Sequence, residues 1–302
     1  MDRFRELEAF VAVVEAGSFV AAGEVLRVSK AAVSRTVLEL EKRLGARLLQ
    51  RTTRRLSITE AGRAYYDRSK QILAELDEAD SAVGEVTGHA VGRLRINAPV
   101  SFGIRHLSGV WGAFMTRYPQ VTLEIELSDR LVDVVDEGFD LVVRISRLHD
   151  STLVHRKLAS TRIIACASPA YLAAHGQPRH PDELAAHATI GYDYSSQGDV
   201  WQFTDADGAT HEVPTRPRAR ANNGDTCRGL VLAGQGVTLM PDFMIGADLT
   251  AGRLAPVLPD YACAEIGIYA VYPSRKHLSV KVRALVDFLA EAFAKPSWKN
   301  PL

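Results

Sequence analysis

Residues 1–45 show hydrophobic positions at three- and four-residue steps, which is the period of amphipathic α-helices. The first stripe consists of Phe4, Leu7, Phe10, Val11 and Val14. Gly17 is expected to end this helix, and Ser18 is expected to cap the next one, over residues 19–26. The pattern therefore predicts two consecutive helices joined by a tight turn.

A third, longer helix is expected over residues 30–44, between an N-cap at Ser29 and a terminating glycine at Gly45. Its inward-facing apolar positions are Val33, Val37, Leu40 and Leu44. A short helix, a turn and a longer helix with a polar outer face are typical of a helix-turn-helix. The alternative is an all-helical bundle whose charged residues are only solvated.

The residues expected to contact DNA lie at the N-terminal end and on the outer face of this third helix. They are Ser29, Lys30, Ala31, Ser34 and Arg35. Small side chains at this end let the backbone enter the major groove. There Lys30 and Arg35 can donate to guanine edges or phosphates, and Ser34 can pair with either base type.

Residues 48–58 predict two short strands joined by a basic hairpin, the pattern of a wing. Arginines at the tip of a wing suit a narrow, electronegative A·T minor groove. The wing residues expected to contact DNA are Arg51, Thr52, Thr53 and Arg54.

A long helix is expected to begin after Thr59, which can act as its N-cap. Apolar residues along it follow heptad spacing: Tyr65, Ile72, Leu76, Ala79, Val83 and Val86. Such a seam indicates a dimerising linker helix, because two DNA-binding modules held at a fixed separation can read a pseudo-palindrome. The alternative is a helix that packs only within its own chain.

The run from Phe10 to Gly62, FVAVVEAGSFVAAGEVLRVSKAAVSRTVLELEKRLGARLLQRTTRRLSITEAG, resembles the DNA-binding domain of LysR-type transcriptional regulators. The chain length and the order of elements are also similar to that family. This sequence has Lys30-Ala31 where family members often have Gln followed by Pro or Ser. A compact cation there replaces a bidentate amide that prefers adenine, so the family's base preference at that position is not carried over.

Beyond Gly88 the pattern changes to short β-rich runs alternating with helices, which predicts α/β layers around a largely parallel sheet. The first set comprises strands at 92–97, 121–127 and 141–144 and helices at 106–118 and 131–137. A second set runs from a strand at 162–167 to a helix at 243–251. The last strand (266–271) and last helix (281–293) return to the first set.

The segments 191–203 and 221–244 resemble the second lobe of the LysR effector domain, which is similar to periplasmic solute-binding proteins. This resemblance implies an α/β chain with three parts. They are a winged helix-turn-helix (1–58), a linker helix (59–88) and a two-lobed effector domain (89–302). Lobe I is expected at about 89–161 and 267–302, and lobe II at about 162–266.

Ligands of open α/β sheets bind at the carboxyl ends of strands, near helix N-termini. This rule selects eight candidate effector contacts: Val100, Ser101, Phe102, Arg144, Asn222, Asn223, Thr226 and Pro241. Ser101, Asn223 and Thr226 can donate to an anion or carbonyl, with Arg144 as a counter-charge. The alternative is ordinary helix capping, in which these side chains satisfy backbone amides.

Length, composition and charge agree with this organisation. The 302 residues exceed one ordinary domain, and 47% are hydrophobic and 24% charged, as in globular proteins. The formal net charge is zero, but residues 27–55 hold nine Lys and Arg against two acids, a local charge of +7. A basic block on a neutral chain indicates a dedicated DNA-binding module.

Three cysteines, Cys166, Cys227 and Cys263, form no paired or metal-binding motif, so no disulfide, metal or cofactor is expected. Cys227 lies just inside a predicted helix start, where the dipole can lower a thiol pKa. The alternative for Cys227 is a small core residue. No signal peptide or long apolar run is present, which favours a cytoplasmic protein without a membrane partner.

No hydrolase, P-loop, dinucleotide or metalloprotease motif occurs, so the sequence does not favour an enzyme. The prediction is a regulator that binds double-stranded promoter DNA and responds to a small effector, with an anion among the candidates. The family implies a homodimer or homotetramer, and RNA polymerase is a candidate partner. The other alternative is an architectural DNA-bending protein, which would bind random duplex as well as any operator.

Overall fold

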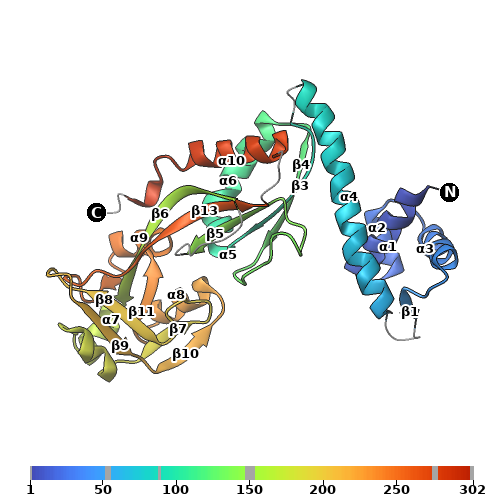
Figure 1. The fold of residues 1–302 in the computed structure, drawn as a ribbon. Helices are drawn as coiled ribbons and strands as arrows, with labels where there is room; N and C mark the ends of the chain where they lie inside the picture. The colour runs from blue at the N-terminus through green and yellow to red at the C-terminus, as the bar shows by residue number, and fades with distance from the viewer. Residues whose placement is uncertain (1, 52–55, 88–89, 147–153, 274–277, 300–302) are drawn as a thin grey trace. The chain divides into compact units, whose positions relative to one another are not determined.

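The computed structural model describes residues 2–51, 56–87, 90–146, 154–273 and 278–299, with the backbone alone at 51, 74, 75, 77–87 and 299. The chain divides into two compact units, Met1–Gly88 and His89–Leu302. Figure 1 traces both units from blue to red along the chain.

The first unit is a three-helix core followed by a short hairpin and a long helix. Its elements are α1 (Arg3–Ala16), α2 (Phe19–Val25), α3 (Lys30–Leu44), β1 (Leu49–Arg51), β2 (Leu56–Ile58) and α4 (Glu60–Thr87). The predicted apolar stripes meet in one buried cluster that includes Phe10, Val13, Ala22, Val33, Val37, Leu40 and Leu48. Burial of this cluster holds the three helices together.

The turn between α2 and α3 depends on local backbone chemistry. Ser18 and Ser29 cap the two helices by accepting from the amide three residues on, at 3.1 and 3.2 Å. A Cβ at Gly23 would lie 2.7 Å from the carbonyl oxygen of Val28, so only glycine allows this close approach. The predicted helix-turn-helix is therefore present.

The wing strands β1 and β2 pair antiparallel, with Leu49 opposite Ile58 and Arg51 opposite Leu56. An acidic side chain of α3 anchors them: Glu41 Oε1 accepts from the amides of residues 48 and 49 at 2.8 and 3.0 Å. The tip of the hairpin, residues 52–55, lies outside the described residues.

The first turns of α4 pack on α1. The ring of Tyr65 lies 5.7 Å from that of Phe10, and the Tyr66 hydroxyl donates to Glu15 at 3.1 Å. Tyr65, the first heptad position, therefore packs within its own chain, as in the single-chain alternative. Ile72 and Leu76 are half-buried. The side chains of Ala79, Val83 and Val86 lie outside the described ones.

A seven-stranded sheet forms the centre of the second unit. Its strands are β3 (Gly92–Ala98), β4 (Val121–Leu127), β5 (Leu141–Ser146), β6 (Val154–Ala167), β11 (Thr238–Pro241), β12 (Ala255–Pro256) and β13 (Glu265–Tyr272). The spatial order is β11-β6-β13-β5-β3-β4, and β12 also pairs with β6. β6 continues from one lobe into the other: its first part pairs with β13 and its last part with β11 and β12.

The prediction of a largely parallel sheet is wrong, because the sheet is mixed. β3 pairs parallel with β4 and β5, whereas β13 runs antiparallel to both β5 and β6. β11 and β12 are also antiparallel to β6. The alternation of strands and helices along a chain does not fix strand direction when a late strand such as β13 inserts between two earlier ones.

The helices of lobe I are α5 (Val100–Phe102), α6 (Ser108–Arg117) and α10 (Val280–Ala292), and α10 runs above the strands in Figure 1. A π-helical turn, η1 (Gly103–Leu107), joins α5 to α6, and a short 3-10 turn, η3 (Ser297–Lys299), follows α10. Phe102, Phe114 and Leu289 are fully buried in the shared core. The helix predicted at 106–118 is therefore divided between η1 and α6.

The helix predicted over 131–137 is absent; the chain forms turns there. Asp133 Oδ1 accepts from the amides of Val135 and Asp136, both at 2.9 Å. Val132 and Val134 are both buried, with Phe139 nearby in the same cluster. Burial at a two-residue step is incompatible with one face of a helix, so packing overrides the apparent helical period.

Lobe II consists of short elements on the far part of β6. They are α7 (Pro169–His175), the 3-10 helix η2 (Pro181–Ala186), β7 (Thr189–Tyr192), β8 (Val200–Thr204), β9 (Thr210–Pro214), β10 (Pro217–Ala221), α8 (Gly224–Leu232) and α9 (Asp242–Thr250). β9, which the sequence does not predict, forms a hairpin with β8. β7 and β10 pair parallel.

Among the described residues, no helix is long and apolar enough to cross a bilayer. The same part of the chain holds no group of three or more His, Cys, Asp or Glu side chains placed to bind a metal ion.

Candidate DNA-binding surface and effector cleft

The N-terminal end of α3 presents the predicted recognition residues. Lys30, Ala31 and Arg35 are exposed, and Ser34 is half-buried. Ser29 is exposed too, but its hydroxyl already accepts the amide of Ala32 as the N-cap. This end of α3 therefore presents two cations beside a small residue. Such residues can donate to phosphates and to guanine edges in the DNA major groove.

The predicted wing contacts cannot be located in the same way. The side chain of Arg51 and the residues Thr52, Thr53 and Arg54 lie outside the described residues.

One arginine of the basic block, Arg43, pairs with a buried acidic residue of α1. Its Nε and Nη2 donate to Glu6 Oε2 at 2.8 and 2.6 Å, and Glu6 is only 2% exposed. The hydrogen bond to Glu6, and then one to Tyr65, raise the pKa of Arg43 above its ordinary value. Arg43 thus joins α3 to α1 through an ion pair, and the Glu6 carboxylate offsets its positive charge.

In the second unit, a cavity of about 510 Å³ lies between the lobes. β3, β5 and residues 128–132 form one side, and β7, residues 193–198, the start of α8, β11 and α9 form the other. Most of its lining is aliphatic or aromatic, with a few polar groups, as is typical of small-molecule sites.

Four of the predicted effector contacts line this cavity: Ser101, Phe102, Arg144 and Pro241. The Arg144 guanidinium donates to the carbonyl of Val132. Phe102 packs edge-to-face on Phe243 with a centroid distance of 5.2 Å. Segments after β3, within β5 and at the end of β11 therefore converge, although they are far apart in sequence.

The other four predicted contacts, Val100, Asn222, Asn223 and Thr226, do not line the cavity. The Val100 amide donates to Asp129 Oδ1 at 2.9 Å. Asn223 caps α8 by accepting from the Thr226 amide at 3.1 Å, and its Nδ2 donates to Asp129 at 3.4 Å. Asn223 therefore acts as a helix cap in this structure, which is the alternative that the sequence left open for it.

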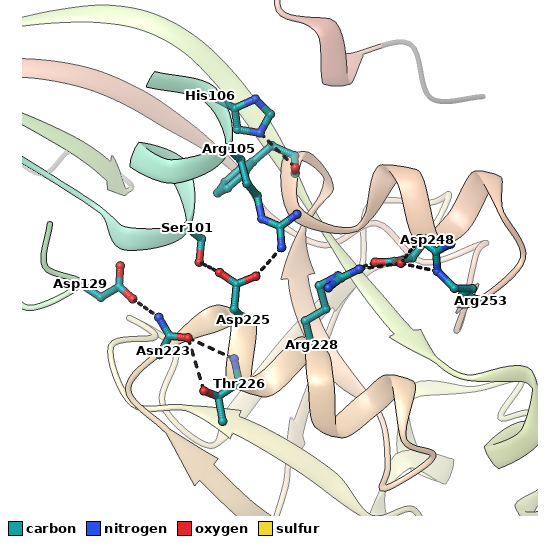
Figure 2. A network of polar contacts seen from close by, with 11 residues as sticks. Ser101, Arg105, His106, Asp129, Asn223, Asp225, Thr226, Arg228, Asp248 and Arg253 are labelled. Carbon is teal, nitrogen blue, oxygen red and sulfur yellow. Dashed lines mark hydrogen bonds and ion pairs between the residues drawn. The ribbon is translucent and has the colours of Figure 1, made fainter. Parts of the chain in front are cut away.

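A polar cluster joins the lobes at the entrance to α8 (Figure 2). The Ser101 hydroxyl donates to Asp225 Oδ2 at 2.7 Å, and Arg105 forms an ion pair with the other carboxylate oxygen. Ser101 and Arg105 belong to lobe I, whereas Asp225 belongs to lobe II. Further along α8, Arg228 pairs with the buried Asp248 at 2.5 Å and so fixes α8 on α9.

Two carboxylates at this junction have shifted pKa values of opposite sign. Burial tends to raise the pKa of Asp225, but hydrogen bonds from Arg105 and Ser101 outweigh it and hold the pKa below its ordinary value. At Asp129, burial dominates over the hydrogen bonds from Val100 and Asn223, so its pKa is raised. The lowered pKa of Asp225 favours its charged form, in which it accepts from Ser101 and pairs with Arg105 across the lobes.

Family models match almost the whole chain. The model described as "Bacterial regulatory helix-turn-helix protein, lysR family" matches residues 4–63, and the "LysR substrate binding domain" matches residues 87–294. The chain belongs to the LysR family.

Characterised relatives agree with this assignment. The chain is 40% identical to an HTH-type transcriptional regulator of Xanthomonas campestris pv. campestris, over 93% of this chain and 82% of the relative. It is 39% identical to the transcriptional regulator PtxR of Pseudomonas aeruginosa, over 97% and 94% of the two chains.

Solved structures match nearly the whole chain. AphB, a virulence activator of Vibrio cholerae, matches with a TM-score of 0.64 at 34% identity, over 96% of this chain and 99% of that one. CrgA of Neisseria meningitidis matches with a TM-score of 0.62 at 35% identity, over 96% and 98%. This LysR-type protein is therefore a DNA-binding transcriptional regulator modulated by a small effector, and not an enzyme.

Several cavity residues of this LysR-type regulator were not predicted from sequence. They include Asn97, Asp129, Tyr192, Cys227 and Phe243. The strand-end rule selects residues that follow a strand, so it omits a side chain within β3 and residues on loops that packing brings over the cleft.

Cys227 lines the cavity but is a poor candidate for a reactive thiol. It is buried, its Sγ lies 3.6 Å from the carbonyl of Gly191, and burial raises its pKa to about 11. Burial therefore outweighs any lowering of this pKa at the helix start, and the thiol stays protonated at neutral pH.

Proposed function

We propose that this regulator reads operator DNA with Lys30, Ala31, Ser34 and Arg35 of α3, backed by Ser29 at its N-cap and by Arg51, Thr52, Thr53 and Arg54 of the wing. Residues 1–58 act as the DNA-binding domain and 59–88 as the linker, so that a dimer or tetramer places modules on successive half-sites. Because its proposed target is promoter DNA, we expect the regulator to act in the cytoplasm. The exposure of Lys30 and Arg35 at the free end of α3 supports this assignment.

The effector binds in the cavity between the lobes of residues 89–302. The observation that carries this proposal is the convergence of Ser101, Phe102, Arg144 and Pro241 on one 510 Å³ cavity. A pocket of this size and largely apolar lining suits a small organic molecule.

Ser101 can couple ligand binding to the arrangement of the two lobes. It lines the cavity, and its hydroxyl donates to Asp225 of the opposite lobe. A ligand that binds one lobe arrangement more tightly shifts the population toward it. A coupling of about 1–3 kcal/mol changes promoter affinity by roughly 5- to 150-fold.

Replacing Ser101 by alanine tests this role. A metabolite library is screened by thermal shift on the full-length wild type, and each stabilising compound is titrated in a footprint of the gene's own upstream region. With Ser101→Ala, the concentration for half-maximal change should rise about two- to tenfold, since one hydrogen bond of roughly 0.5–1.5 kcal/mol is lost. Footprints without the compound should match the wild type.

Ser108→Ala is the matched control, because the Ser108 hydroxyl donates to the carbonyl of Gly103 and does not line the cavity. An unchanged dose-response in Ser101→Ala would remove Ser101 from the effector site.

A further inference from the structure

One polar side chain at the floor of the cavity has no role in the contacts described so far. Asn97 is the next-to-last residue of β3, it lines the cavity, and it is only 2% exposed. Its neighbours Ile96 and Ala98 belong to the hydrophobic core. Because side chains alternate along a strand, Asn97 points to the opposite face, toward the cavity.

The Asn97 amide is unpartnered. Among the described residues, no acceptor lies within hydrogen-bond distance of its buried Nδ2. Leaving a buried amide donor unpaired costs free energy, and the great majority of such groups in proteins have a partner. Thr238 offers a contrast, because its hydroxyl also lines the cavity but donates to the carbonyl of Ile190 at 2.9 Å.

The surroundings of Asn97 define what else a ligand must present. Most of the cavity lining is aliphatic, aromatic or thioether, including Leu131, Val142, Ile163, Tyr192, Met240 and Phe243, and polar or charged residues such as Asp129, Arg130, Arg144 and Asp193 complete it. A ligand body in contact with the apolar part of this lining must be apolar, because a polar body would lose its hydration without compensation. A buried, unpaired hydrogen-bond donor within a largely apolar lining fixes the orientation of a ligand and selects for a matching acceptor.

We propose that Asn97 is a specificity-determining residue of the effector site, and that its Nδ2 donates to a carbonyl oxygen on an effector whose remaining part is apolar. This inference rests on the proposed function of the cavity. A site built to hydrogen-bond a ligand group discriminates strongly against the analogue that lacks it, since the protein group is then left unpaired.

Acetophenone and ethylbenzene form a suitable probe pair, because they have nearly the same shape and differ in the carbonyl oxygen. Their dissociation constants for the full-length regulator are measured by ligand-detected NMR titration. Wild type should bind acetophenone about tenfold more tightly than ethylbenzene, which corresponds to one hydrogen bond to a buried amide. In Asn97→Leu this preference should vanish, mainly through weaker binding of acetophenone.

Two further variants make the test specific. Thr238→Val removes a lining hydroxyl that already has a partner, so it should keep the wild-type preference for acetophenone. Asn97→Ala removes the amide without adding bulk and should lose the preference as Asn97→Leu does. The melting temperature of unliganded Asn97→Leu should be equal to or above that of wild type, because an unpaired buried amide is replaced by an apolar side chain.

Three results would overturn the inference, and they separate it from the proposed function. Equal binding of both probes to wild type, or a preference that survives in both Asn97 variants, removes Asn97 from recognition but leaves the cavity as the effector site. If neither probe binds wild type at millimolar concentration, the inference fails, whereas the cavity as effector site is decided separately by the thermal-shift screen and Ser101→Ala.

Discussion

Replacing Arg35 by alanine is expected to reduce operator affinity by about two orders of magnitude. Arg35 is exposed on the outer face of α3, one turn after the helix begins, where an arginine can donate two hydrogen bonds to guanine. One good base contact contributes roughly 1–3 kcal/mol, and a dimer on two half-sites loses it twice. Fluorescence anisotropy with the gene's upstream fragment, over a range of salt concentrations, measures the effect.

Lys42→Ala is the control for Arg35→Ala. It removes the same charge from an exposed position in the last turn of α3, away from the predicted groove. Its effect should be several-fold at most and similar for random duplex, because it acts only through long-range electrostatics. Size-exclusion profiles of both variants should match the wild type. Full operator affinity in Arg35→Ala would show that α3 is not the recognition helix.

Replacing Arg43 by methionine is expected to destabilise the first unit by about 3 kcal/mol. The substitution leaves the Glu6 carboxylate buried without its cation, and breaking such a pair from one side costs roughly 3–5 kcal/mol. The lower end of that range applies because the Arg43 side chain is still 33% exposed. One Glu6 oxygen, Oε1, already has no partner among the described residues, so no other group compensates.

The three tryptophans of the chain, Trp111, Trp201 and Trp298, all belong to the second unit. Urea unfolding followed by far-ultraviolet circular dichroism should therefore show an earlier helical transition in Arg43→Met, while tryptophan fluorescence keeps its midpoint. The double variant Glu6→Leu/Arg43→Met should recover much of the loss, because it leaves no buried charge. Coincident shifts in both signals would contradict a role confined to the first unit.

The winged helix-turn-helix was predictable because its determinants are local. Helix period, the caps Ser18 and Ser29, and the glycines at positions 17 and 45 each act within a few residues. The role of Arg43 was not predictable in the same way. Its partner Glu6 is 37 residues away, and the basic composition of the block gave no sign that one arginine pairs with a buried carboxylate.

In the effector domain, the failures share a physical cause. The direction of β13 depends on which earlier strands it enters between, and the turns at 131–137 depend on burial of Val132 and Val134 under distant segments. Both are long-range choices that override local propensity. The strand-end rule selected Ser101 and Pro241, which line the cavity, but it also selected Asn223, which caps α8 by accepting from the Thr226 amide.

By itself, the sequence determined the α/β class, the DNA-binding module with its recognition face, and the resemblance to LysR-type regulators. Those features depend on residue types at short, regular spacings, which hold in any tertiary context. Only the tertiary structure decided the mixed sheet, the cavity, the Ser101–Asp225 contact between the lobes and the unpaired amide of Asn97. Each of these depends on groups that are far apart in sequence and meet in the protein interior. There, a polar group with a hydrogen-bond partner and one without differ in their contribution to the free energy of folding.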